Sequence, residues 1–141
     1  MRLLHYPGGP EVSDPNEVGI AAHTDFECIT LIYQGAPGLE LTRPSGEWLD
    51  APHSGGRIVV LLGDMLERWT NGYFRATGHR VRETAHQRFS IVMFIAANEG
   101  IEIRPLSKFV SARTPALYGP VTQAAHIEAE MRRSRENSAA G

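Results

Sequence analysis

Residues 19–62 read GIAAHTDFECITLIYQGAPGLELTRPSGEWLDAPHSGGRIVVLL and contain several short runs of β-branched and other apolar residues. The runs cover residues 19–24, 29–33, 39–42, 48–51 and 58–62. Segments rich in Gly and Pro separate most of them, as in QGAPG and RPSG. Short strands about ten residues apart with such turn residues are typical of a β-sandwich or barrel, and not of alternating strands and helices.

The flanking sequence extends this pattern in both directions. Residues 2–6, 79–83 and 88–97 are further predicted strands, and the apolar run IVMFIAA at 91–97 indicates a strand covered on both faces. Asp64 is expected to cap one helical turn near 64–70. Pro120, as the first helical residue, is expected to open a helix that ends near 137. The predicted fold is therefore mainly β, a jelly-roll double sheet with a C-terminal helix.

Composition excludes several classes of function. The 14 Lys and Arg residues against 16 Asp and Glu give a net charge of −2, so no nucleic-acid or membrane partner is expected. A single cysteine, Cys28, allows neither an internal disulfide nor a thiolate-rich metal site. The chain contains no apolar run long enough to span a bilayer and no signal-like N-terminus, so we expect a cytoplasmic protein.

His23-Thr24-Asp25 is a candidate metal-binding motif. On a strand, residues two apart face the same way, so His23 and Asp25 present an imidazole and a carboxylate to one point. His79 opens a later strand and is a candidate third ligand. Two histidines and one carboxylate form the facial triad of non-haem Fe(II) oxygenases. The motif alone also fits a surface or turn pair without a ligand.

Arg88 and Ser90 also share one face of a strand, next to the long apolar run. A buried guanidinium needs an anionic partner, and its planar fork matches a carboxylate. The pair therefore predicts a carboxylate-binding site. The alternative is an internal ion pair of Arg88 with Glu83 or Asp64.

These motifs together resemble the H-x-D…H…R-x-S pattern of the isopenicillin N synthase-like 2-oxoglutarate/Fe(II)-dependent dioxygenases. The flanking segments LHYP at 4–7, PGL at 37–39 and GDMLERWTNG at 63–72 are similar too. The resemblance runs from about residue 2 to about 126 and concerns the C-terminal catalytic core of that family. It implies a double-stranded β-helix over residues 1–105. The residue pattern itself predicts an irregular segment and a helix packing on this core over 106–137, and a disordered tail at 138–141.

The resemblance also implies roles for six residues. His23, Asp25 and His79 would bind Fe(II), while Arg88 and Ser90 would bind the distal carboxylate of 2-oxoglutarate. Tyr6 would donate a hydrogen bond to the same co-substrate. The implied activity is an O₂-dependent oxidation of a small organic molecule, by hydroxylation, desaturation or cyclisation, with release of succinate and CO₂.

Two alternative functions stay open from the sequence. In isopenicillin N synthase-like oxidases the R-x-S pair binds the substrate carboxylate, and 2-oxoglutarate is not used. The chain could also be a truncated, non-catalytic metal-binding domain. Because relatives carry a longer N-terminal region, we expect one of two situations. Either a partner subunit or self-association covers an apolar face of this chain, or the chain is a fragment with an exposed apolar face and low stability on its own.

Overall fold

The computed structural model describes residues 1–9, 18–53, 56–83 and 85–139. Contacts within the chain define two compact units. The first comprises residues 1–24, 30–61 and 77–94, and the second comprises residues 25–29, 62–76 and 95–141.

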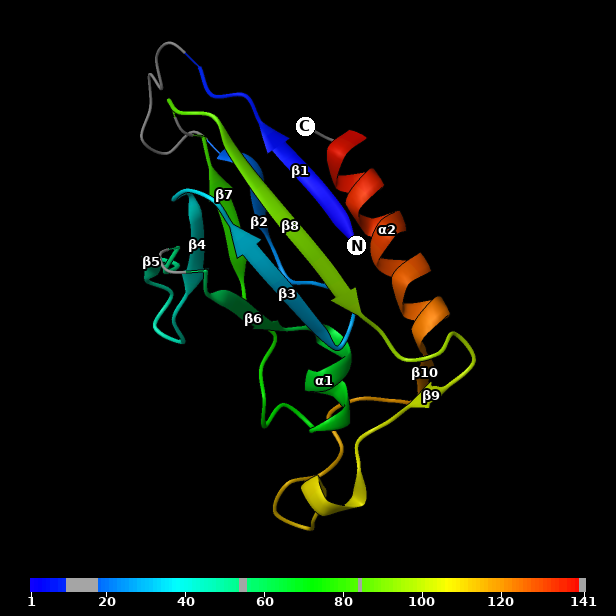
Figure 1. The fold of residues 1–141 in the computed structure, drawn as a ribbon. Coiled ribbons are helices and arrows are strands. Elements are labelled where there is room, and N and C mark those ends of the chain that lie inside the picture. Colours follow the sequence, from blue (N-terminus) through cyan, green and yellow to red (C-terminus); the bar gives the residue numbers. More distant parts are fainter. Residues whose placement is uncertain (10–17, 54–55, 84, 140–141) are drawn as a thin grey trace. The chain divides into compact units, whose positions relative to one another are not determined.

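The first unit contains two four-stranded sheets (Figure 1). One sheet has the order β1 (Arg2–Tyr6), β8 (Arg88–Ile95), β3 (Ile29–Gln34) and β6 (Ile58–Leu62). The other has the order β2 (Val18–His23), β7 (His79–Arg82), β4 (Leu39–Thr42) and β5 (Trp48–Asp50). Most strands that are neighbours in a sheet are far apart in the sequence, as in a jelly roll. The predicted mainly β double sheet is confirmed.

Apolar side chains from both sheets form the core of this unit. Ile32 and Leu61 come from one sheet, and Leu39 and Val81 come from the other. Along their strands, Ile32, Leu61 and Val81 alternate with more exposed neighbours. Burial of one face of each sheet therefore fixes which strand residues point between the sheets.

Leu61 offers a test of this core, because it is 1% exposed, whereas its neighbour Val60 is 55% exposed. Leu61→Ala should lower the free energy of unfolding by about 2–5 kcal/mol, since it leaves a cavity. Val60→Ala should change it by less than about 0.5 kcal/mol. Denaturant titration of both variants measures the difference, and equal effects would contradict this assignment of the buried face.

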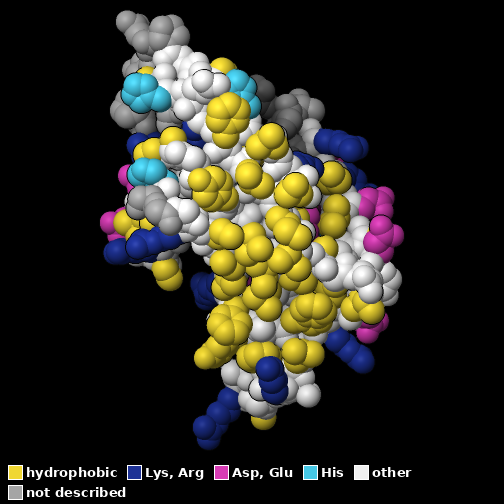
Figure 2. Space-filling view, in the orientation of Figure 1, with side chains coloured by type: hydrophobic (Ala, Val, Ile, Leu, Met, Phe, Trp, Pro, Cys, Tyr) yellow, Lys and Arg dark blue, Asp and Glu magenta, His cyan; other side chains and the backbone are white. Residues whose placement is uncertain are grey.

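The outer face of the sheet that contains β8 is exposed and apolar (Figure 2). Phe89, Ile91 and Met93 are 47%, 42% and 48% exposed, and they alternate with the buried Arg88, Ser90 and Val92. The expectation that both faces of this strand are covered is therefore wrong for the described chain: the core packs on one face only. An exposed apolar face of this kind is typical of a surface that contacts other polypeptide.

The second unit contains the helices. Its elements are α1 (Asp64–Trp69), β9 (Glu102–Ile103), the 3₁₀ turn η1 (Ser107–Phe109), β10 (Val121–Thr122) and α2 (Gln123–Ala139). Cys28, Met65 and Ile103 form its small core, and Met65 and Ile103 are fully buried. No helix within the described residues is both long and apolar enough to cross a membrane.

Both predicted helix starts differ from the structure. The N-cap of α1 is Gly63 and not Asp64, because Asp64 is already the first residue of the helix. The Asp64 N–H donates to the Asp25 carbonyl at 2.9 Å. Helix α2 starts at Gln123 and not at Pro120, because Val121 and Thr122 pair with β9. The Thr122 hydroxyl then accepts from the Ala125 N–H at 3.2 Å.

The predicted helix end also differs. Helix α2 continues to Ala139, into the segment expected as a tail. The rest of that segment, 140–141, lies outside the described residues.

Candidate active site

Strand pairing places two histidines side by side. His23 ends β2 and His79 begins β7, and the two residues are partners in the antiparallel register. Their ring centroids lie 4.2 Å apart. Nδ1 of His23 lies 2.8 Å from the Ala21 carbonyl and Nδ1 of His79 lies 3.0 Å from the Thr77 carbonyl. Because a carbonyl can only accept, Nδ1 carries the proton in each neutral ring and Nε2 carries the lone pair.

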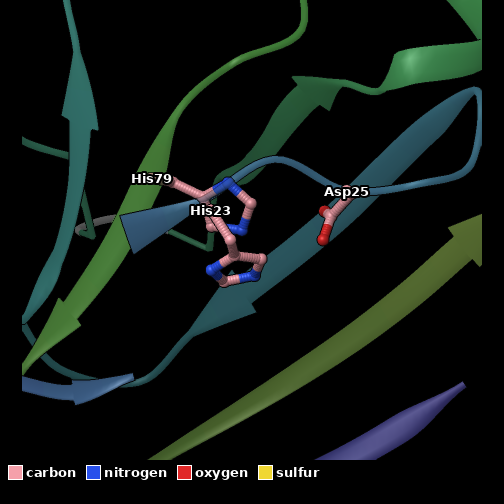
Figure 3. A group of neighbouring side chains, drawn as sticks. All are labelled: His23, Asp25 and His79. Carbon is pink, nitrogen blue, oxygen red and sulfur yellow. The ribbon is translucent and has the colours of Figure 1, made fainter. Parts of the chain in front are cut away.

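Asp25 completes a group of potential metal ligands with these histidines. It follows the last residue of β2 by two positions, and one ligand atom from each of His23, Asp25 and His79 lies within 4.8 Å of the others. Figure 3 shows the two imidazoles next to each other, with the Asp25 carboxylate turned toward them. Asp25 and His79 are 7% and 4% exposed. The donor set, two imidazole nitrogens and one carboxylate, suits a non-haem Fe(II) site.

Arg88 lies on the buried face of β8 and is 2% exposed. Its Nη2 donates to the Ser90 hydroxyl at 3.0 Å and to the Gln34 side-chain oxygen at 3.4 Å. The guanidinium carbon lies 4.5 Å from the centre of the Tyr6 ring, and Tyr6 is the register partner of Arg88 on β1. The structure thus brings the three predicted co-substrate residues together.

The electrostatics of Arg88 favour an anionic ligand. Within the described part of the chain, its Nε and Nη1 are buried and have no hydrogen-bond partner. The alternative ion pairs with Glu83 or Asp64 are not observed among these residues, and the Asp64 carboxylate instead lies 3.1 Å from His126. Burial lowers the pKa of Arg88 and raises the pKa of Tyr6, and each group partly offsets the shift of the other. Both groups stay protonated at neutral pH, so both can donate to an anion.

Gln34 is a site residue that sequence reasoning missed. It is 1% exposed, and its Nε2 lies 3.3 Å from the carbonyl oxygens of Ala51 and Pro52. Those contacts turn its Oε1 toward Arg88. The strand pattern contains a signal for this residue. Gln34 lies two residues after the buried Ile32, on the same face of β3, so it is a polar residue in a core position.

Gly63 supports the segment that carries Asp25. A Cβ at Gly63 would clash with the Glu27 carbonyl oxygen and would lie 3.0 Å from that of Asp25. We expect Gly63→Ala to displace this backbone and to lower the free energy of unfolding by about 1–3 kcal/mol. Gly100→Ala is the control, because a Cβ there meets nothing within 4 Å. Equal denaturation midpoints for the two variants would show that the close approach does not matter.

Comparisons with known proteins agree with this geometry. A family model described as the 2OG-Fe(II) oxygenase superfamily matches residues 1–97. The chain is 40% identical over 109 residues to the 2-oxoglutarate-dependent dioxygenase tropC of Talaromyces stipitatus, covering 75% of this chain and 33% of that protein. It is 40% identical over 126 residues to the 2-oxoglutarate-Fe(II) type oxidoreductase hxnY of Emericella nidulans, covering 86% and 36%.

Solved structures show the same fold. A full-length Neurospora crassa protein in complex with alpha-KG superposes with a TM-score of 0.85 at 29% identity, over 94% of this chain and 43% of that one. The rice dioxygenase for auxin oxidation gives a TM-score of 0.80 at 26% identity, over 97% and 46%.

The chain belongs to the 2OG-Fe(II) oxygenase superfamily. It has the double-stranded β-helix fold of these enzymes. The chain spans about a third of the length of the curated relatives it matches, 33% for one and 36% for another.

Proposed function

We propose that this protein is an Fe(II)- and 2-oxoglutarate-dependent oxygenase that oxidises a small organic molecule. The observation that carries this proposal is the buried guanidinium of Arg88, which has two nitrogens without a partner among the described residues. A buried unpaired cation costs several kcal/mol, so such a group is expected where a ligand supplies the negative charge. A dicarboxylate such as 2-oxoglutarate meets that requirement.

His23, Asp25 and His79 are the proposed iron ligands. Their ligand atoms lie within 4.8 Å of one another. The hydrogen bonds of both Nδ1 atoms to backbone carbonyls support this assignment, because they orient the rings and leave the Nε2 lone pairs for a metal. With three protein ligands, a bound metal would keep coordination positions for co-substrate and O₂.

Arg88, Ser90 and Tyr6 are the proposed residues for the distal carboxylate of 2-oxoglutarate. Two guanidinium N–H groups can bind a carboxylate in the fork geometry that makes such pairs strong. The phenol of Tyr6 lies against the guanidinium and is protonated, so it can supply a further donor. The Gln34 side-chain oxygen accepts from Nη2 of the same guanidinium.

In this arrangement the protein positions the reactants. Bound Fe(II) with 2-oxoglutarate supplies the oxidising chemistry, in which 2-oxoglutarate and O₂ become succinate and CO₂ as the substrate is oxidised. Arg88 sets the position of the co-substrate from the inner face of one sheet, while His79 lies on the inner face of the other. The apolar core residues next to them, Val92 and Val81, exclude water from this side.

The direct test is an assay of the purified chain with Fe(II), 2-oxoglutarate and O₂. The proposal predicts succinate formation that increases with a suitable small-molecule substrate. A substrate panel can start from thymine, which is bound in another structure of the Neurospora crassa protein. Oxygen uptake independent of 2-oxoglutarate would instead identify an oxidase, and metal binding without oxygen uptake would identify a non-catalytic domain. Cytoplasmic localisation and a covering partner stay predictions.

A further inference from the structure

The segment that carries Asp25 is not part of a regular strand. His23 and His79 lie in paired strands, where ladder hydrogen bonds hold the backbone, but Asp25 comes after the end of β2. In place of ladder hydrogen bonds, three N–H groups from the first residues of α1 and from its N-cap Gly63 bind this segment. The N–H groups of Asp64, Met65 and Gly63 donate to the carbonyls of residues 25, 27 and 28 at 2.9, 3.2 and 2.9 Å.

The fourth carbonyl of this segment, that of Phe26, is bound by a side chain. Nε2 of Gln123, the first residue of α2, donates to it at 3.1 Å. The Gln123 oxygen accepts from the Ala97 N–H at 3.3 Å, and the residue is 2% exposed. A buried amide that is bonded at both ends has one low-energy orientation, because rotation would leave polar groups buried and unpaired.

His126, one helical turn further along α2, contacts the same region. Its Nε2 lies 3.1 Å from the Asp64 carboxylate, and Asp64 is the residue whose N–H binds the Asp25 carbonyl. Its ring meets the Phe26 ring edge to face, with centroids 6.3 Å apart. His126 is 8% exposed. Two adjacent turns of α2 thus contact the Asp25 segment and the start of α1.

We infer that Gln123 and His126 are positioning residues that fix the backbone carrying the Asp25 carboxylate. The inference rests on the proposed function, because it concerns the same metal site. Metal affinity depends on preorganised ligands, and loss of a group that orients a ligand typically costs about 10- to 100-fold in affinity. Neither residue is a member of the group of potential metal ligands. Helix α2 therefore acts on the metal site only through the backbone that carries Asp25.

Two variants of the full chain test this inference. Gln123→Met keeps the side-chain volume and removes both hydrogen bonds, and His126→Leu removes the bond to Asp64. Each should weaken Co(II) binding, measured by calorimetric titration, by about 10- to 100-fold. Amide hydrogen exchange of residues 63–65 in the metal-free protein should become faster, while exchange in β7 stays unchanged. Arg132→Ala, at an exposed position of the same helix, should change neither measurement.

The outcomes separate the inference from the proposed function. Unchanged Co(II) affinity and unchanged exchange at 63–65 in both variants would overturn the inference. Faster exchange in β7 as well would show a general loss of stability and would also overturn it. If the unaltered chain does not bind Co(II), the proposed function fails, and the exchange measurement alone then decides whether α2 fixes the Asp25 segment.

Discussion

Replacing His79 with alanine is expected to weaken binding of Fe(II) or Co(II) by more than about 100-fold, and to abolish succinate formation. The expected loss exceeds the roughly 10- to 100-fold effect typical of groups that only orient a ligand, because the change removes a proposed ligand itself. Only His23 and Asp25 of the group would remain. Calorimetric titration with Co(II), which binds the same donor types, gives the affinity without turnover.

A matched control tests whether the loss of Co(II) affinity is specific to His79 or follows from removal of any histidine. His53→Ala changes an exposed residue outside the metal group and should leave Co(II) affinity and succinate formation unchanged. If His79→Ala binds Co(II) as tightly as the unaltered chain, His79 is not a ligand and the metal site lies elsewhere.

Arg88→Met is expected to weaken 2-oxoglutarate binding by at least about 30-fold, with no loss of stability in the ligand-free protein. Truncation of one partner in a buried charge pair costs about 2–5 kcal/mol. The smaller of these values corresponds to the roughly 30-fold loss of 2-oxoglutarate affinity. Without ligand, two nitrogens of the buried Arg88 guanidinium have no partner within the described chain. An apolar side chain of similar length should therefore be neutral or stabilising there.

Arg88→Met is thus expected to weaken 2-oxoglutarate binding without lowering the stability of the ligand-free protein, and this combination makes the test specific. Thermal melting with Co(II), with and without 2-oxoglutarate, reports both, because a bound ligand raises the melting temperature. Arg104→Met is the control, since the Arg104 side chain is 73% exposed and pairs with Glu102. A large loss of stability in ligand-free Arg88→Met would show that Arg88 serves the fold and not a ligand.

Much of the fold is predictable from local patterns. Gly and Pro residues next to β1, β4 and β6 mark the bounds of these strands, because Gly and Pro favour turns and interrupt strands. The ends of α2 were harder to predict. A short β10–β9 pairing, followed by a cap from Thr122, sets the start of the helix. Pro120, three residues before the helix, does not reveal that pairing.

Some residues of the candidate site were predictable from the sequence, and others were not. Motif spacing and family resemblance pointed to His23, Asp25, His79, Arg88, Ser90 and Tyr6. Gln34 and Gln123 carry no motif, and their roles follow only from the partners that the fold brings to them. A glutamine becomes informative when it is buried, because its amide must then find partners.

The amino-acid sequence was enough to establish the strand pattern, the pairs of side chains that share a strand face, and the residue types suited to iron and to a carboxylate. These properties depend on backbone periodicity and on side-chain chemistry, which are local. The folded chain was needed to show that His23 and His79 are register partners and that Arg88 is buried without an anion among the described residues. It was also needed to show that Gln123 of α2 donates to the Phe26 carbonyl. These properties depend on contacts between residues distant in sequence, and burial of the apolar core within each unit selects them.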